Sequence, residues 1–349
     1  MSLISLANPG DFASRVQAFY NPKLQDALKF NLALAPYGLQ GKYPAGAVSG
    51  VPTVRFFRPR IANTVGVGAI TEGTTPTTLS EVAVGYVDVP LTQRGQLAKV
   101  TDLVLATDLL DTVKLYTQTM GADAALDLDT VCRNALLTAL NDSNATYTGA
   151  FFERFGGTAN TGTSSTDFTT LVGKAANASQ LTRSENMKCL TQLKAAKVPQ
   201  INGKFVAITP PEVIHDLRQD TTITAAFQYS DVQALYKNAQ LSLDGCVFVE
   251  ATNPFRETAY KTYAAAGAIF STIYLGAAAF GVPGLDNVKA GGSPFSPQLI
   301  IINKPDHSNP LGLYVQLGWK AMYGAKALIT NVAGEVPHHL VFRSKSTFA

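Results

Sequence analysis

The residues that could carry out chemistry are few and scattered. Of the four histidines, His338 and His339 are adjacent near the end of the sequence. Such a pair could bind a metal, but a lone pair supplies only part of a zinc ligand set, and we expect both to be surface residues. The three cysteines, Cys132, Cys189 and Cys246, form no Cys-x-x-Cys motif. This favours reduced thiols over a zinc ribbon or a disulfide framework.

Two pairs of carboxylates also have spacings that could serve acid–base chemistry. Asp123 and Asp127 are one helical turn apart, and Asp108 and Asp111 are spaced similarly. Without a nearby cluster of His or Lys to act with them, we expect a polar stripe on a solvated helix face. The sequence has no Gly-x-Ser-x-Gly, Walker A, Gly-x-Gly-x-x-Gly or His-Glu-x-x-His motif. We therefore assign no catalytic, cofactor-binding or metal-binding residue.

The composition is that of a folded chain with large contact surfaces. The 349 residues are 46% apolar and only 15% charged, against about 25% charged in an average soluble protein. This excludes global disorder, because disordered chains are rich in charge and poor in apolar residues. The low charge also suggests that partners cover much of the surface. The net charge of +3 is too small for a dedicated nucleic-acid binder.

No membrane or secretory segment is expected. The N-terminal sequence lacks a basic region followed by an apolar core, so it does not resemble a secretory signal. Residues 264–285 are uncharged over roughly the ~20 residues that a spanning helix needs. However, four glycines and Pro283 interrupt this stretch. We predict two buried strands joined by a glycine turn.

Residues 53–100 are expected to form a long β-hairpin. Polar and apolar residues alternate at 53–57 and again at 81–93, which is typical of strands. The Gly- and Thr-rich segment between them would be the tip. Because an isolated two-stranded hairpin is marginal in water, this one should dock on another surface. Residues 1–52 contain five prolines and lack strong periodicity, which predicts an extended arm with a brief helix near 22–34.

Residues 102–141 carry the clearest helical periodicity, and Thr101 and Asp102 supply a capping signal in front of them. A helix of this length would extend roughly 55–60 Å. Since there is no Ile/Leu heptad pattern, we expect a strut packed on a sheet. The apolar stripe consists of Leu109, Val113, Tyr116, Met120, Ala124, Leu128, Val131 and Ala135.

Helices and strands follow one another in the rest of the chain. Thr182 and Glu185 form a capping box that opens a helix over 182–197. Pro210 and Pro211 begin another helix after a buried strand. Trp319 is expected in the core. Strands are predicted at 204–209, 246–251, 268–275 and 298–303, with two more within 312–331. Together these elements predict an α+β fold whose strands come from distant parts of the chain.

The order of these elements resembles the Hong Kong 97 fold of tailed-bacteriophage major capsid proteins and of encapsulins. Local strings are similar to the major capsid family of coliphage N-four and its relatives, in the family's order and over nearly the whole chain. These strings are TVRFFRPR with ITEGTTPTTLSEVAVGYVDVPLTQRGQLAKVTD, KFVAITPPEVIHDLRQD, IYLGAAAFGVPG and HSNPLGLYVQLGWKAMYGAKAL.

The resemblance implies a domain organisation and a structural function. Hexamers and pentamers of the chain would form an icosahedral shell around double-stranded phage DNA, in the virion and, during assembly, in the host cytoplasm. The implied partners are a portal, a separate scaffolding protein, optionally a decoration protein, and DNA in non-specific proximity, but no membrane. The implied parts are an N-terminal arm (1–52), an E-loop hairpin (53–100), a peripheral domain with the spine helix (101–205), an axial domain (206–298) and a return to the peripheral domain (299–349).

Two other function classes stay open. An encapsulin-type nanocompartment shell has the same fold and would enclose an enzyme. An enzyme of unknown class is disfavoured by the absence of a catalytic constellation. In the Hong Kong 97 phage itself, an E-loop lysine joins an asparagine of another subunit. Here no lysine lies between Lys42 and Lys99, so we expect no such covalent link.

Opposite net charges on two elements suggest how subunits would meet. Residues 53–100 have a net charge of +2, and residues 101–141 have one of −4. Because this fold stacks the hairpin of one subunit on the spine helix of another, complementary charge would favour correct register. Ordinary solvated faces are the alternative. The candidate inter-subunit contact residues are Arg55, Arg58, Arg60, Arg94, Asp108, Asp111, Asp123 and Asp127.

Overall fold

The structure is a computed structural model that describes part of the 349-residue chain, and structural statements concern only that part. The described residues are 33–41, 53–61, 72–73, 82–107, 112–138, 153–155, 180–220, 223, 242–251, 269–283, 298–302, 305, 309–329 and 337–345.

Strands from distant parts of the sequence form a mixed six-stranded sheet, in the order β5–β14–β9–β6–β8–β7. β6 and β8 are parallel, and α6 lies between them in sequence. Apolar residues of α5 and α6 pack in one core with one face of this sheet. The bounds are β5 Glu153–Phe155, α5 Arg183–Ala195, β6 Phe205–Thr209, α6 Pro211–Gln219, β7 Ser242–Leu243, β8 Cys246–Glu250, β9 Ile269–Leu275 and β14 His339–Lys345.

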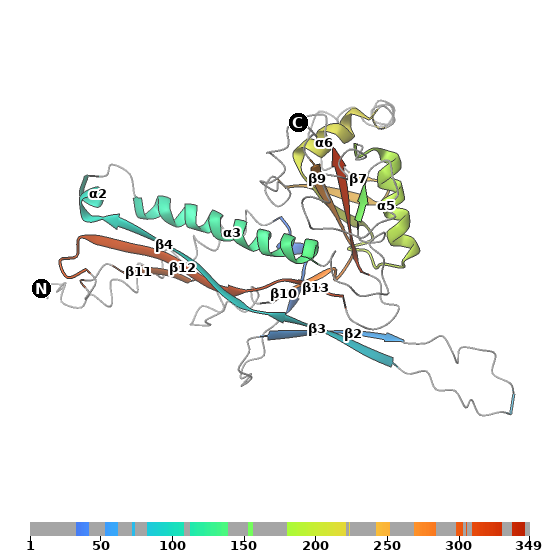
Figure 1. The fold of residues 1–349 in the computed structure, drawn as a ribbon, viewed down its shortest axis with the longest axis horizontal. Helices are drawn as coiled ribbons and strands as arrows, with labels where there is room; N and C mark the ends of the chain where they lie inside the picture. Colours follow the sequence, from blue (N-terminus) through green and yellow to red (C-terminus); the bar gives the residue numbers. More distant parts are fainter. Residues whose placement is uncertain are drawn as a thin grey trace, which may run out of the picture.

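A second sheet, of three strands, runs along the long helix α3 (Figure 1). In it β12 (Tyr314–Tyr323) lies between β11 (Gln298–Ile302) and β4 (Thr92–Thr101) and is antiparallel to both. α3 (Thr112–Thr138) packs on one face of this sheet. The expected strut on a sheet is therefore confirmed. The sequence predicted one strand over 81–93. The structure instead has β3, a corner at Leu91 and then β4 as a separate strand.

The long helix buries the centre of the predicted stripe. Met120, Ala124 and Leu128 are buried, whereas Tyr116 is exposed. The structure describes the expected helix over 102–141 as α2 (Asp102–Thr107) and α3. Residues 108–111 between these two helices, including Leu109, lie outside the described part.

The predicted hairpin is present as the antiparallel pair β2 (Thr53–Ile61) and β3 (Val82–Pro90). It is seated against a small sheet in which β10 (Phe280–Pro283) lies between β1 (Leu39–Gly41) and β13 (Lys326–Ala327). A short 3-10 helix, η1 (Ala35–Tyr37), precedes β1. The buried cluster at the hairpin base consists of Val54, Phe56, Val87, Val89, Leu91 and Leu328.

Other local predictions are confirmed. Thr182 Oγ1 accepts a hydrogen bond from the Glu185 backbone N–H at 3.4 Å, which caps α5. Trp319 is buried. The uncharged stretch 264–285 contains β9 and β10, joined by a tight turn. None of the helices in the described part of the chain is long and apolar enough to cross a membrane.

Candidate functional site

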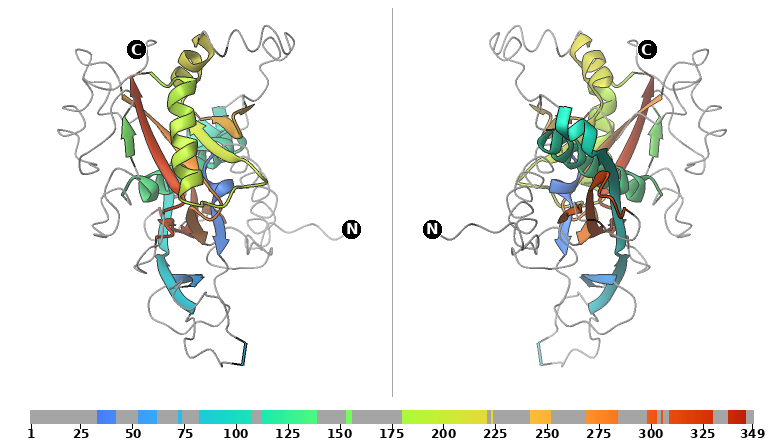
Figure 2. Two further views of the ribbon diagram at one scale, coloured as in Figure 1. Left: turned by 90° about the vertical axis from the view of Figure 1, so that its right-hand side faces the viewer. Right: turned by 90° about the vertical axis from the view of Figure 1, so that its left-hand side faces the viewer.

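The hairpin has two unlike faces because successive side chains of a strand point to opposite sides. Its inner face belongs to the buried cluster at the hairpin base. On the other side, Phe57 is 62% exposed and Tyr86 is 51% exposed, and the two residues are directly opposite each other. Neighbouring exposed aromatic rings are typical of contact surfaces. We call Arg55, Phe57, Tyr86 and Asp88 the outer hairpin face; Figure 2 shows the hairpin extending away from the sheets.

An ion pair flanks the two rings. Arg55 Nε and Nη2 donate hydrogen bonds to the two carboxylate oxygens of Asp88, at 2.7 and 2.8 Å. The guanidinium carbon also lies 4.1 Å from the centre of the Tyr86 ring. The hydrogen bond from Arg55 lowers the pKa of Asp88. An exposed pair of this kind contributes little to stability, but it holds Arg55 over Tyr86 on the outer hairpin face.

Arg58 anchors the hairpin to the rest of the chain. Its Nη2 lies 2.6 Å from His338 Nε2, and its Nη1 donates to the carbonyl oxygen of Leu328. His338 Nδ1 lies 2.7 Å from the carbonyl oxygen of Ala277. Arg58 Nη2 also lies 2.8 Å from Nδ1. When Nδ1 carries the proton and donates to Ala277, Nε2 is the ring atom that accepts from Arg58. A neutral imidazole therefore joins β2 to the turn after β9.

The prediction that His338 and His339 are surface residues is wrong. His339 is fully buried on β14, and His338 is half-buried. Burial lowers the pKa of each histidine to about 4, and the Arg58 charge adds to the effect at His338. Among the described residues, no group of three or more potential metal ligands is found. The burial of the two histidines results from packing against distant parts of the chain, so the neighbouring sequence does not predict it.

We expect the subunit to lose stability as the pH falls from 6.5, the ordinary histidine value, to about 4. Because the folded pKa values are the lower ones, the unfolded chain binds more protons within this window. The contribution to the free energy of unfolding should be complete above pH 6.5 and lost as the pH falls through 4, a decrease of roughly 3 kcal/mol for each histidine. Urea unfolding at several pH values measures it.

Two variants separate this effect from general acid sensitivity. His339→Gln should reduce the pH dependence of unfolding between pH 6.5 and 4. His215→Gln is the matched control, since His215 lies on α6 with a side chain that is 47% exposed. The same pH dependence in the wild type and in His339→Gln would contradict the prediction.

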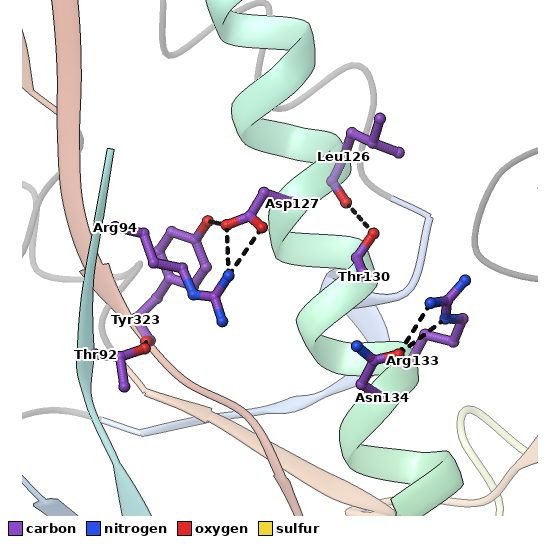
Figure 3. A network of polar contacts seen from close by, with 8 residues as sticks. All are labelled: Thr92, Arg94, Leu126, Asp127, Thr130, Arg133, Asn134 and Tyr323. Atoms are coloured by element: carbon purple, nitrogen blue, oxygen red, sulfur yellow. Dashed lines mark hydrogen bonds and ion pairs between the residues drawn. The ribbon is translucent and has the colours of Figure 1, made fainter. Parts of the chain in front are cut away.

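Arg94 is a predicted inter-subunit contact, but it joins β4 of the three-stranded sheet to α3 within one chain (Figure 3). Its Nη1 lies 2.9 and 3.1 Å from the two carboxylate oxygens of Asp127 on α3. The Tyr323 hydroxyl of β12 donates to the same carboxylate. Burial and this hydrogen bond raise the pKa of Tyr323. The expectation that Asp127 belongs to a freely solvated stripe is therefore wrong.

The other predicted contact residues have different surroundings. Asp123 is exposed on α3, as are Leu115 and Leu126 on the same helix. Arg60 lies on β2, but its side chain is outside the described part, and so are Asp108 and Asp111. Asp123 is thus a described acid that a neighbouring subunit could reach. Contact of any of these residues with another subunit stays a prediction.

Asp129 is a key residue that was not among the predicted contacts. It is only 3% exposed, although its charge is part of the net charge of −4 of residues 101–141. Its carboxylate accepts hydrogen bonds from the backbone of residues 33–35. The signal in the sequence is its position, because Ala125, Asp129, Cys132 and Leu136 recur at helical spacing on one buried face.

Solved structures of phage capsids are similar to the chain over nearly its whole length. The cyanophage Pam1 capsid asymmetric unit has a TM-score of 0.60 and 17% identity, covering 90% of this chain and 92% of the other. The capsid of Ralstonia phage GP4 has a TM-score of 0.62 and 14% identity, covering 91% and 92%. The capsid of cyanophage P-SCSP1u has a TM-score of 0.57 and 15% identity, covering 91% and 90%.

No protein-family model and no curated protein sequence matches the chain. The likeness is therefore one of three-dimensional structure, in which the α+β class predicted from the sequence is confirmed. It spans about nine-tenths of both chains in each comparison. The chain has the fold of these phage capsid structures, the Hong Kong 97 fold that its sequence resembles.

Proposed function

We propose that the chain is the major capsid protein of a tailed bacteriophage. It assembles as hexamers and pentamers into an icosahedral shell that encloses double-stranded DNA. The observation that carries the proposal is the shared fold with phage capsid structures over nearly the full length of both chains. The outer hairpin face supports it, because Phe57 and Tyr86 are exposed side by side and would be covered by a neighbour. This role requires no catalytic residue.

The proposal includes partners outside the chain. A portal, a separate scaffolding protein and, in some shells, a decoration protein would complete the particle. Contact with the packaged DNA would be non-specific, in keeping with a net charge of only +3. The chain would be found in the virion and, before that, in the host cytoplasm. A closer relationship to the coliphage N-four type rests on similar sequence strings alone.

Negative-stain electron microscopy of the purified protein tests this function. We expect capsomers or closed shells, formed alone or on addition of the scaffolding protein. Sedimentation should place the wild type in particles far heavier than the 37.0 kDa chain. A protein that stays a monomer at high concentration, with and without scaffolding protein, would contradict the proposal.

An encapsulin-type shell is the alternative. The similar solved structures from Pam1, GP4 and P-SCSP1u are phage capsids, which favours a phage capsid here as well. The genes beside the coding sequence distinguish the two. Portal and terminase genes would support a phage capsid, whereas a gene for a cargo enzyme would support a nanocompartment. An enzymatic function has no observation in its favour.

We propose further that charge helps to seat the hairpin on the α3 helix of a neighbouring subunit. Asp123 is the suitable acid to test, because it is exposed and Asp127 is held by Arg94. Asp123→Asn should slow assembly slightly and make it less sensitive to salt, since each exposed pair is worth about 0–1 kcal/mol. Light scattering at several salt concentrations measures this. If the assembly rate and its salt dependence were both unchanged, charge would not contribute to seating the hairpin.

Mature particles should contain no covalent link through the hairpin. A lysine nucleophile is missing from residues 43–98, so the shell must depend on non-covalent contacts or on an added protein. Particles boiled in denaturant should therefore run as single chains of 37.0 kDa in gel electrophoresis. A ladder of covalent oligomers would show that this prediction is wrong.

A further inference from the structure

A buried carboxylate on the long helix holds a segment from the N-terminal part of the chain. Asp129 Oδ2 accepts a hydrogen bond from the Ala33 N–H at 2.7 Å. Its Oδ1 accepts from the N–H groups of Leu34 and Ala35 at 3.1 and 3.3 Å. These residues are about 95 positions apart in sequence. One side chain thus binds three successive backbone donors of a distant segment.

The geometry resembles helix capping supplied from another element. The first N–H groups of a helix have no partner within it, and a side-chain oxygen at the N-cap usually accepts from them. The N-cap residue of η1 is Leu34, whose side chain has no hydrogen-bond acceptor. Asp129 on α3 accepts from Ala35, the first residue of η1, and from Ala33 and Leu34, which precede it. Burial raises the pKa of Asp129, and the three backbone hydrogen bonds oppose this by stabilising the anion.

The held segment includes β1, which pairs with β10. Gln40 Nε2 donates to the Ala35 carbonyl oxygen at 3.1 Å, which ties β1 back to η1. β1 then pairs in parallel with β10, with Leu39 opposite Gly281 and Gly41 opposite Pro283. Residues 33–41, which we call the clamp segment, are therefore fixed to α3 at one end and to β10 at the other.

The far end of the clamp segment contacts the inner side of the hairpin. A Cβ atom added to Gly41 would overlap the Phe56 ring, and one added to Gly281 would lie within 3.1 Å of the same ring. Phe56 of β2 thus packs against one face of the paired strands β1 and β10, over Gly41 and Gly281, where a larger residue would collide with the ring. It is 7% exposed. Any shift of β1 must move this ring or leave a cavity beside it.

We propose that the clamp segment couples the long helix to the hairpin, and that Asp129 is the positioning residue that sets this coupling. When Asp129 holds residues 33–35, β1 is placed to support Phe56 and the hairpin is fixed. When the carboxylate is removed, the clamp segment loosens and the hairpin loses its seat. The consequence for a shell rests on the proposed function. There, this coupling would let the position of the N-terminal arm control the contact made by the outer hairpin face.

Hydrogen exchange of the purified, unassembled protein tests the coupling independently of any shell. Asp129→Ala should speed amide exchange at residues 33–35 by roughly tenfold or more and also, by several-fold, in β2. Amide exchange in β6, which belongs to the six-stranded sheet, should not change. Leu128→Ala is the matched control, because it removes a fully buried side chain from the adjacent helix position. It should raise exchange in all these elements together.

Two further variants keep the test decisive if Asp129→Ala folds poorly. Asp129→Asn retains an acceptor for Leu34 and Ala35 and should restore most of the protection in both regions. Gly41→Ala disturbs the other end, and since coupling is reciprocal, it should speed exchange at residues 33–35. Faster exchange at 33–35 with unchanged exchange in β2 would overturn the proposal, as would a Gly41→Ala effect confined to the hairpin.

Discussion

Replacement of both Phe57 and Tyr86 by serine is expected to abolish shell assembly while the subunit stays folded. The two rings are 62% and 51% exposed in the single chain, so their loss costs the fold little. Burying a large apolar side chain is worth about 1.5–3 kcal/mol, and aromatic anchors often dominate interfaces. Removing two from every contact should lower assembly by at least a hundredfold, because each ~1.4 kcal/mol is a factor of ten. Sucrose-gradient sedimentation and electron microscopy measure the outcome.

Phe56→Ala is the matched control, because Phe56 is the neighbour of Phe57 on the opposite face of β2. It is 7% exposed and belongs to the cluster at the hairpin base. Its truncation should lower the free energy of unfolding by about 3 kcal/mol, whereas the serine double variant should unfold at the wild-type urea concentration. Normal particles from the double variant would show that the outer hairpin face is not the contact surface.

Gly324→Ala is expected to destabilise the subunit more than any exposed substitution. Gly324 lies between β12 and β13, and a Cβ atom there would overlap the carbonyl oxygen of Pro90. That oxygen belongs to the backbone at the corner where β3 turns into β4, so rotating a side chain cannot relieve the clash. We expect the free energy of unfolding to fall by about 3 kcal/mol or more. The hairpin should also lose order, because the corner positions it.

A second glycine variant shows whether crowding is the cause. Gly245 has a φ of +89°, and no atom lies within 4 Å of an added Cβ. Gly245→Ala should therefore cost only the backbone strain of about 1–2 kcal/mol. Urea unfolding of both variants measures the difference. A smaller loss for Gly324→Ala than for Gly245→Ala would mean that the corner adjusts freely.

Most individual elements follow from local signals in the sequence. Alternation at 53–57 predicted β2, and the Thr182 and Glu185 pair predicted the start of α5. Such signals suffice because strand alternation, helical spacing and capping involve residues close in sequence. β4 was missed for the opposite reason. Its alternation is weak, and it is specified by pairing with β12, more than 200 residues later.

The sequence by itself therefore determined the type and order of the main elements, the resemblance to capsid proteins and the absence of a hairpin lysine. Only the tertiary structure decided which polar side chains are buried and what binds them. Asp129 bonds to residues about 95 positions away, and Arg58 contacts a histidine 280 positions away. A buried charge is stable only where such partners converge. Helical spacing places Asp129 on the inner face of α3, but the donors that hold it there come from folding of the distant chain.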